Sequence, residues 1–77
     1  MNQLMPLAMV SPGEVVEMVD IKAGWGLRRK LADMGLTSGV VIRVMNRQVP
    51  GPIVIDLRGS RLVLGYGMTQ KILVRKL

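Results

Sequence analysis

Cysteine, histidine and phenylalanine are absent from this chain of 77 residues, and each absence narrows what the protein can do. Without cysteine there is no disulfide to hold the fold together and no thiolate for catalysis. Without histidine the chain lacks the commonest general base and the commonest transition-metal ligand. Trp25 and Tyr66 are the only aromatic residues, so the hydrophobic core must be built from aliphatic side chains.

Acidic residues are also scarce, and they are spread over separate predicted elements. The chain has five of them: Glu14, Glu17, Asp20, Asp33 and Asp56. Glu14 and Glu17 are three apart on a predicted strand, which points them to opposite faces, so no carboxylate pair for acid–base catalysis is visible. Gly24-Trp25-Gly26 lacks the length and the terminal Lys-Ser/Thr of a phosphate-binding loop. We therefore predict that the chain is not an enzyme and holds neither a cofactor nor a resident metal.

Positive charge is what the chain has in excess, with eleven Lys and Arg residues and a formal net charge of +6. Such a balance favours an acidic partner, which could be a protein surface, a nucleic acid or an anionic membrane face. No apolar run approaches the roughly 18 residues that a transmembrane helix needs. The N-terminal ten residues lack a basic n-region and are interrupted by Pro6, unlike a signal peptide. We expect a cytoplasmic protein that is not inserted in a membrane.

Five segments have the alternating apolar pattern of short strands, and turn residues separate most of them. The expected strands are 14–21, 40–47, 53–58, 61–64 and 71–76. The first one alternates imperfectly, with Val15, Glu17, Val19 and Ile21 on one face, which indicates either a β-bulge or burial on both faces. Gly59-Ser60 is expected to form a two-residue hairpin turn.

One amphipathic helix is predicted over residues 27–34. Leu27, Leu31 and Met34 recur at helical spacing, and Gly35 follows as a left-handed C-cap. A helix of two turns needs packing against the sheet to be stable. Five antiparallel strands with this helix inserted after the first predict an all-β fold that closes into a small barrel, with residues 1–77 forming one domain.

Two other binding functions remain open from the residues alone. Basic side chains lie at outward-facing or loop positions of the strands (Arg43, Arg47, Arg58, Arg61, Lys71 and Arg75), and these could follow nucleic-acid phosphates. The strands lack the aromatic residues on which single-stranded bases stack, which disfavours this function. Direct binding of a transition-metal ion is the other alternative. The seven methionines, however, have irregular spacing that is typical of core filling.

Short motifs recur in an order and spacing that resemble the FeoA family of ferrous iron transport accessory proteins. They are Pro6-Leu7, Pro12-Gly13-Glu14, Val19-Asp20-Ile21, Gly26-Leu27-Arg28, Lys30-Leu31-Ala32-Asp33-Met34-Gly35-Leu36, Gly39, Gly51-Pro52, Gly59-Ser60-Arg61-Leu62-Val63-Leu64-Gly65, Gly67-Met68 and Lys71-Ile72-Leu73-Val74. The resemblance begins near Pro6, which leaves Met1 and Met5 open as the native start. Lys30 stands where the family often has arginine, so this position keeps its charge but loses the planar guanidinium.

The resemblance implies an SH3-like fold, which also occurs as the C-terminal domain of iron- and manganese-dependent repressors. It further implies an accessory role in ferrous iron uptake, through contact with the FeoB permease and its cytosolic G-protein domain. Whether such a contact changes nucleotide hydrolysis or only the assembly of the permease stays open.

Two groups of residues are candidates for partner binding. The first is Trp25, Arg28, Arg29 and Lys30, because a tryptophan between glycines ahead of a basic helix is typical of an interface anchor. The second is the loop 47–52, in which Arg47 and Gln48 come before two prolines. An apolar patch of Val41, Met45, Val54 and Leu73 could support weak self-association, or the N-terminal segment could cover it.

Overall fold

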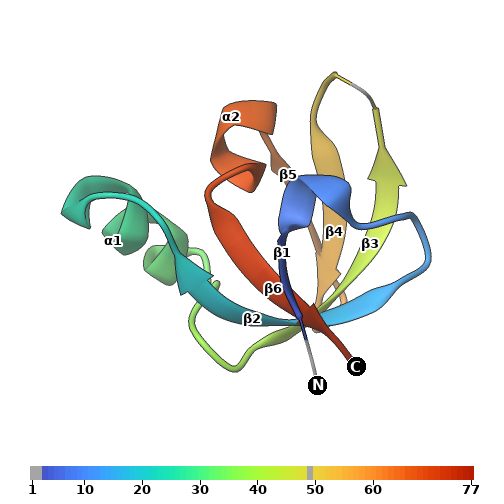
Figure 1. Ribbon diagram of the computed structural model, residues 1–77, viewed down its shortest axis with the longest axis horizontal. Coiled ribbons are helices and arrows are strands. Elements are labelled where there is room, and N and C mark those ends of the chain that lie inside the picture. The colour runs from blue at the N-terminus through green and yellow to red at the C-terminus, as the bar shows by residue number, and fades with distance from the viewer. Residues whose placement is uncertain (1–2, 49) are drawn as a thin grey trace.

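One curved antiparallel sheet forms the body of the computed structural model, which describes residues 3–48 and 50–77 (Figure 1). The strands lie in the order β1-β6-β2-β3-β4-β5. Their bounds are Leu4–Pro6 (β1), Val15–Ile21 (β2), Val41–Arg47 (β3), Ile53–Leu57 (β4), Ser60–Leu64 (β5) and Ile72–Lys76 (β6). The helical elements are the 3₁₀ turn η1 (Leu7–Met9), α1 (Trp25–Asp33) and α2 (Tyr66–Thr69). The predicted all-β class is confirmed. The predicted helix is α1, which follows the second strand because β1 was not predicted, and α2 is a second short helix that the sequence did not predict.

The N-terminal segment adds a strand to the expected five. β1 pairs with β6 in the register Leu4↔Arg75 to Pro6↔Leu73. Pro6 is compatible with this strand because β1 lies at the edge of the sheet, where a missing N–H breaks no ladder. A three-residue strand is too short to show an alternating pattern, and for this reason the sequence did not predict it.

A β-bulge in β2 explains why this strand alternates imperfectly. The register against β6 shifts between Met18 and Asp20. Val16, Met18 and Ile21 are therefore all buried on one face, although Ile21 is an odd number of residues from both. The bulge was one of the two predicted explanations. Val15, which simple alternation places on the same face as Ile21, points outward and is exposed.

Helix α1 begins two residues before the predicted start and ends where Gly35 predicted. Gly35 has φ of +90°, and its N–H donates to the carbonyl of Ala32, while the N–H of Leu36 donates to the carbonyl of Leu31. This pair of hydrogen bonds is a Schellman motif, and the buried side chains of Leu31 and Leu36 supply the hydrophobic contact that accompanies it. Leu31 therefore fastens the helix to the core at its last turn.

The β4–β5 hairpin turns one residue earlier than predicted. Leu57 pairs with Ser60, so Arg58 and Gly59 are the two turn residues rather than Gly59 and Ser60. Their φ values of +52° and +88° are those of a type I′ turn, whose twist matches that of the flanking strands. Arg58 thus adopts a left-handed conformation, which is unfavourable in free energy for a residue that has a Cβ atom.

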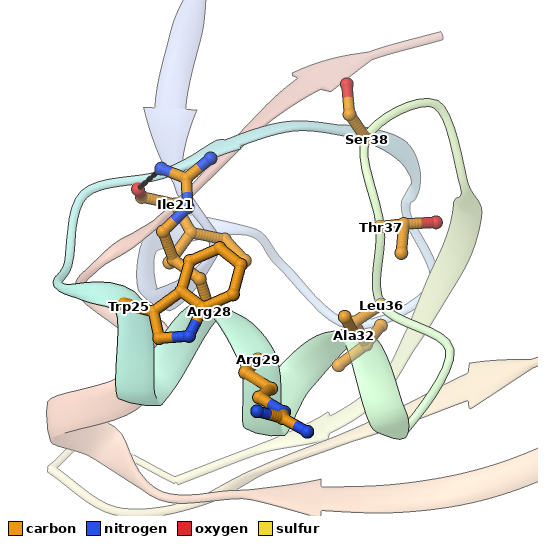
Figure 2. A pocket seen from close by; sticks show the side chains of 8 residues that line it. All are labelled: Ile21, Trp25, Arg28, Arg29, Ala32, Leu36, Thr37 and Ser38. Carbon is orange, nitrogen blue, oxygen red and sulfur yellow. Dashed lines mark hydrogen bonds between the residues drawn. The ribbon is translucent and has the colours of Figure 1, made fainter.

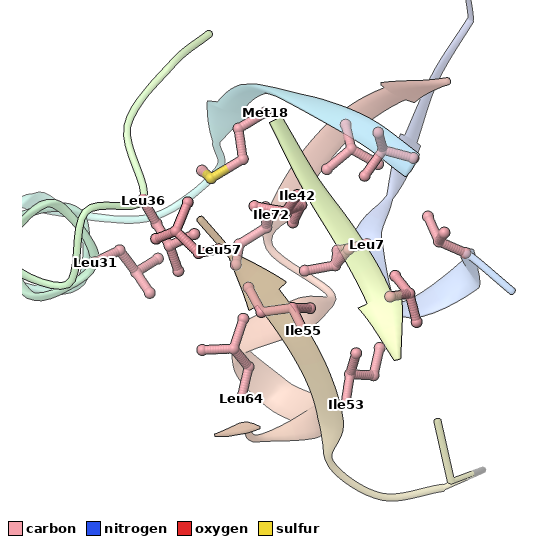
Figure 3. Packing of buried hydrophobic residues seen from close by; sticks show 14 of the residues in the cluster. Leu7, Met18, Leu31, Leu36, Ile42, Ile53, Ile55, Leu57, Leu64 and Ile72 are labelled. Carbon is pink, nitrogen blue, oxygen red and sulfur yellow. The ribbon is translucent and has the colours of Figure 1, made fainter. Parts of the chain in front are cut away.

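The core fills the concave side of the sheet and is aliphatic, as expected (Figure 3). Alternate residues of β3 and β4 supply much of it, namely Ile42, Val44, Ile53, Ile55 and Leu57. The edge strands β1 and β5 do not pair with each other, so the sheet is a barrel that does not close by hydrogen bonds. Instead η1 contacts α2 at the open side. Among the described residues, no helix is long and apolar enough to cross a membrane.

Candidate functional site

A pocket of about 300 Å³ lies against α1 and brings together three of the predicted partner-binding residues (Figure 2). Its lining is Ile21, Trp25, Arg28, Arg29, Ala32, Leu36, Thr37 and Ser38. Ile21 and Leu36 belong to the core and provide an apolar wall. Sequence reasoning missed the opposite wall, Thr37 and Ser38, because nothing in the sequence shows that the turn after Gly35 folds back beside the helix.

Trp25 is the first residue of α1, and its side chain is 75% exposed. Gly24 caps the helix in an extended conformation and Gly26 follows, with no heavy atom within 4 Å of where a Cβ of either would lie. The indole is therefore displayed on the surface and does not cover the end of the barrel. Most of its surface is therefore available to a partner.

Arg28 fastens the helix to β2. Its Nη1 donates to the carbonyl oxygen of Ile21 at 3.0 Å and lies 3.5 Å from Oδ1 of Asp20. The same carboxylate oxygen accepts the N–H of Ile21 at 2.8 Å. Arg28 therefore positions the start of α1, and only part of its charge is available to a partner.

Arg29 differs from its neighbour because no ion pair of the described residues involves it. Its side chain is exposed at the edge of the pocket (Figure 2). Lys30 is also exposed, but it does not line the pocket. The lining includes two guanidinium groups and no carboxylate, which makes this surface complementary to an acidic partner.

The second predicted pair, Arg47 and Gln48, lies apart from the α1 pocket. Nη1 of Arg47 donates to the carbonyls of Ala8 and Val10, each at 3.3 Å. Gln48 is exposed, and its backbone N–H donates to the carbonyl of Pro52 at 3.3 Å. Figure 1 shows α1 on one side of the molecule and the end of β3 on another. The structure therefore separates the six predicted residues into two surfaces.

The basic residues of the strands do not form an unbroken stripe. Arg75 is 3.0 Å from a carboxylate oxygen of Glu17 on the neighbouring strand. Asp56 is the cross-strand neighbour of both Arg43 and Arg61. The outer face thus carries opposite charges side by side. This arrangement stabilises strand pairing, and it does not offer the continuous positive charge that would bind a chain of phosphates.

Glu14 is also engaged in an ion pair. Glu14 is 3.0 Å from Nζ of Lys76, and it accepts the backbone N–H of Ser11 at 3.1 Å. The hydrogen bond from Lys76, and after it the one from Ser11, lowers the pKa of Glu14. In the described part of the chain, no three acidic side chains converge as a metal site would require.

The apolar patch predicted for self-association is mostly covered. Of its four residues only Val41 is exposed, and Met45, Val54 and Leu73 are half-buried. Leu73 lies opposite Pro6 of β1, so the N-terminal segment accounts for part of this cover. The α1 pocket combines an exposed aromatic residue with Arg29, which no ion pair of the described residues involves.

Two comparisons of the sequence with known proteins point to the same family. The sequence profile described as "FeoA domain" matches residues 5–76. A protein of Methanocaldococcus jannaschii, described as "Putative Fe(2+) transport protein A", is 38% identical over 69 residues, which cover 90% of this chain and 83% of that protein.

Solved structures show the same relationship in three dimensions. A crystal structure of an iron uptake regulatory protein (FeoA) superposes with a TM-score of 0.91 and 39% identity, covering 97% of this chain and 100% of that one. A manganese-dependent transcriptional repressor has a TM-score of 0.90 with 23% identity, and the match covers 100% of this chain but 44% of the repressor, so the two share a fold alone. The SH3-like fold implied by the motifs is confirmed, and this chain belongs to the FeoA domain family.

Proposed function

We propose that this protein is a cytoplasmic accessory factor of ferrous iron uptake that acts by binding, not by catalysis, and that its partner is the G-protein domain of a FeoB-type permease. The family membership supports the role in iron transport. The observation that supports the binding surface is Trp25, a 75% exposed indole beside a pocket that has two guanidinium groups and no carboxylate in its lining.

The arrangement matches the anatomy of a binding hot spot. Tryptophan and arginine are enriched at such positions, because a large rigid ring and a planar cation give much contact for little lost conformational entropy. The apolar wall formed by Ile21 and Leu36 lies within reach of a partner side chain that enters beside Trp25. We infer that the partner inserts an apolar side chain into the pocket and places a carboxylate near Arg29.

Arg29 is the residue to test, because Arg28 holds α1 to β2 and its replacement would disturb the helix. The variant Arg29→Glu is titrated into the purified G-protein domain by isothermal calorimetry at low ionic strength. An ion pair lost and replaced by repulsion at a partly desolvated interface weakens binding by about tenfold or more. Lys71→Glu changes the net charge equally at an exposed residue that is not part of the pocket lining, and it serves as the matched control.

The comparison of the two variants separates surface contact from overall charge. Equal loss in both would mean that only the net positive charge attracts the partner. Unchanged affinity in Arg29→Glu at low salt would exclude this surface as the docking site.

A further inference from the structure

A second groove, of about 470 Å³, lies at the open side of the barrel between η1 and α2. Met9, Ser11, Arg47, Tyr66 and Gln70 line it, together with Pro6 and Ala8 of the N-terminal segment. None of these residues lines the α1 pocket. We propose that this groove binds a peptide segment of a partner protein that carries a glutamate or aspartate beside an apolar residue, with the carboxylate held by Arg47.

A bulge in β3 turns Arg47 toward the groove. The register between β3 and β4 shifts between Val44 and Asn46, and beyond the shift Arg47 pairs with Ile53. Cross-strand partners lie on the same face, and Ile53 is 1% exposed in the core. Arg47 therefore lies on the concave face, at the open end of the barrel, and not on the outer face or in the loop where the sequence predicted it.

The guanidinium of Arg47 is held in one orientation by hydrogen bonds, and part of it makes no hydrogen bond to the described residues. Nη1 donates to the carbonyls of Ala8 and Val10, which holds the group in place. Among the described residues, Nε and Nη2 have no hydrogen-bond partner. These two N–H groups lie on one edge of the guanidinium plane and match the two oxygens of a carboxylate.

The charge around the groove favours an anion over a neutral ligand. Arg47 is the only charged residue in the lining, and the lining has no carboxylate. Glu14 lies close, because it accepts the N–H of Ser11, but Lys76 pairs with it at 3.0 Å. The remaining groups toward the groove are the hydroxyls and amide of Ser11, Tyr66 and Gln70, which are neutral hydrogen-bonding partners.

Apolar contact is available beside the charge. Met9 is 63% exposed and Tyr66 is 41% exposed, and both line the groove. Thr69 keeps Tyr66 in place, since its buried hydroxyl donates to the Tyr66 carbonyl at 3.0 Å and closes the single turn of α2. The volume is that of a site for a few residues of peptide rather than for a folded surface.

The test uses two matched peptides, acetyl-Leu-Glu-Leu-amide and acetyl-Leu-Gln-Leu-amide, titrated into the ¹⁵N-labelled full chain. We expect the glutamate peptide to shift the Arg47 Nε–H resonance and the amides of Ala8, Ser11 and Gln70. The glutamine peptide should bind at least about tenfold more weakly, because it cannot accept the charged bidentate contact. Equal shifts with both peptides, or shifts confined to α1, would overturn the proposal.

Arg47 itself is left in place, because its hydrogen bonds to Ala8 and Val10 hold the N-terminal segment. The groove is tested at Gln70 instead. Gln70→Glu places a carboxylate in the groove at an exposed position, and we expect it to weaken the glutamate peptide about threefold or more by like-charge repulsion. Gln3→Glu makes the same chemical change at an exposed residue outside the groove and should leave the affinity near wild type. Identical affinities of both variants would refute the site. Neither outcome depends on Arg29, so failure here is distinct from failure of the α1 surface.

Discussion

Trp25→Ala separates the contribution of the indole to binding from its contribution to stability. A tryptophan can bury up to about 250 Å² of surface, and three quarters of this side chain is exposed, which leaves about 190 Å² for a partner to cover. At about 25 cal/mol per Å² this area sets a ceiling of about 5 kcal/mol on its contribution to binding. Measured hot spots cost about 2–4 kcal/mol on truncation, so we expect the affinity to fall by at least about 30-fold.

The same arithmetic predicts a small effect on folding. The quarter of the side chain that is buried corresponds to about 60 Å², which is worth at most about 1.5 kcal/mol. Extended-chain reference areas overstate burial, so the measured loss should be smaller. Calorimetric titration against the G-protein domain gives the first quantity, and urea unfolding followed by circular dichroism gives the second.

Two outcomes would contradict a role of Trp25 as an interface anchor. Wild-type affinity in Trp25→Ala would show that the exposed indole is not an interface anchor. A loss of stability that equals or exceeds the loss of binding energy would show instead that the residue is structural. Trp25→Phe is the informative companion, since it keeps an aromatic ring and should recover part of the affinity.

Three further predictions concern the fold. Arg58→Asn should stabilise the protein by about 0.5–1 kcal/mol, because asparagine tolerates the left-handed conformation of this type I′ turn, and a lower urea midpoint would contradict this. Leu31→Ala should cost about 2–5 kcal/mol in urea unfolding, a large share of the roughly 4–12 kcal/mol expected for a chain of this length, and a loss below about 1 kcal/mol would show that α1 is not fastened by this residue. Glu14→Gln should destabilise the fold at pH 7, because hydrogen bonds from Lys76 and Ser11 lower the pKa of Glu14 in the folded state. A carboxyl whose pKa is lowered on folding contributes stability above the unfolded value of 4.5, and this contribution is lost as the pH falls through the folded value. The thermal unfolding curves of wild type and variant should therefore converge at acidic pH, and a constant gap between them would exclude the mechanism.

The strand faces that are regular in sequence were predictable, and the irregular ones were not. Ile53, Ile55 and Leu57 alternate without interruption, and the structure buries all three. Ile42 and Val44 behave in the same way up to the point where β3 bulges. A bulge inserts one residue into the alternation, so every residue beyond it lies on the face opposite to the one that alternation predicts. The position of a bulge cannot be found by counting along the sequence.

For the candidate site, too, some features follow from the local sequence and others only from tertiary contacts. The sequence alone determined the aliphatic core, the end of α1 at Gly35 and the absence of histidine and cysteine chemistry, because each depends on residue type or local backbone preference. The exposure of Trp25 was decided by the tertiary structure. Only the tertiary structure decided that Arg28 holds the carbonyl of Ile21 while Arg29 does not share that role. It also decided that Arg47 faces a groove at the open side of the barrel. Those outcomes depend on strand register and on contacts between residues far apart in the chain, and such contacts exist only once the sheet has formed.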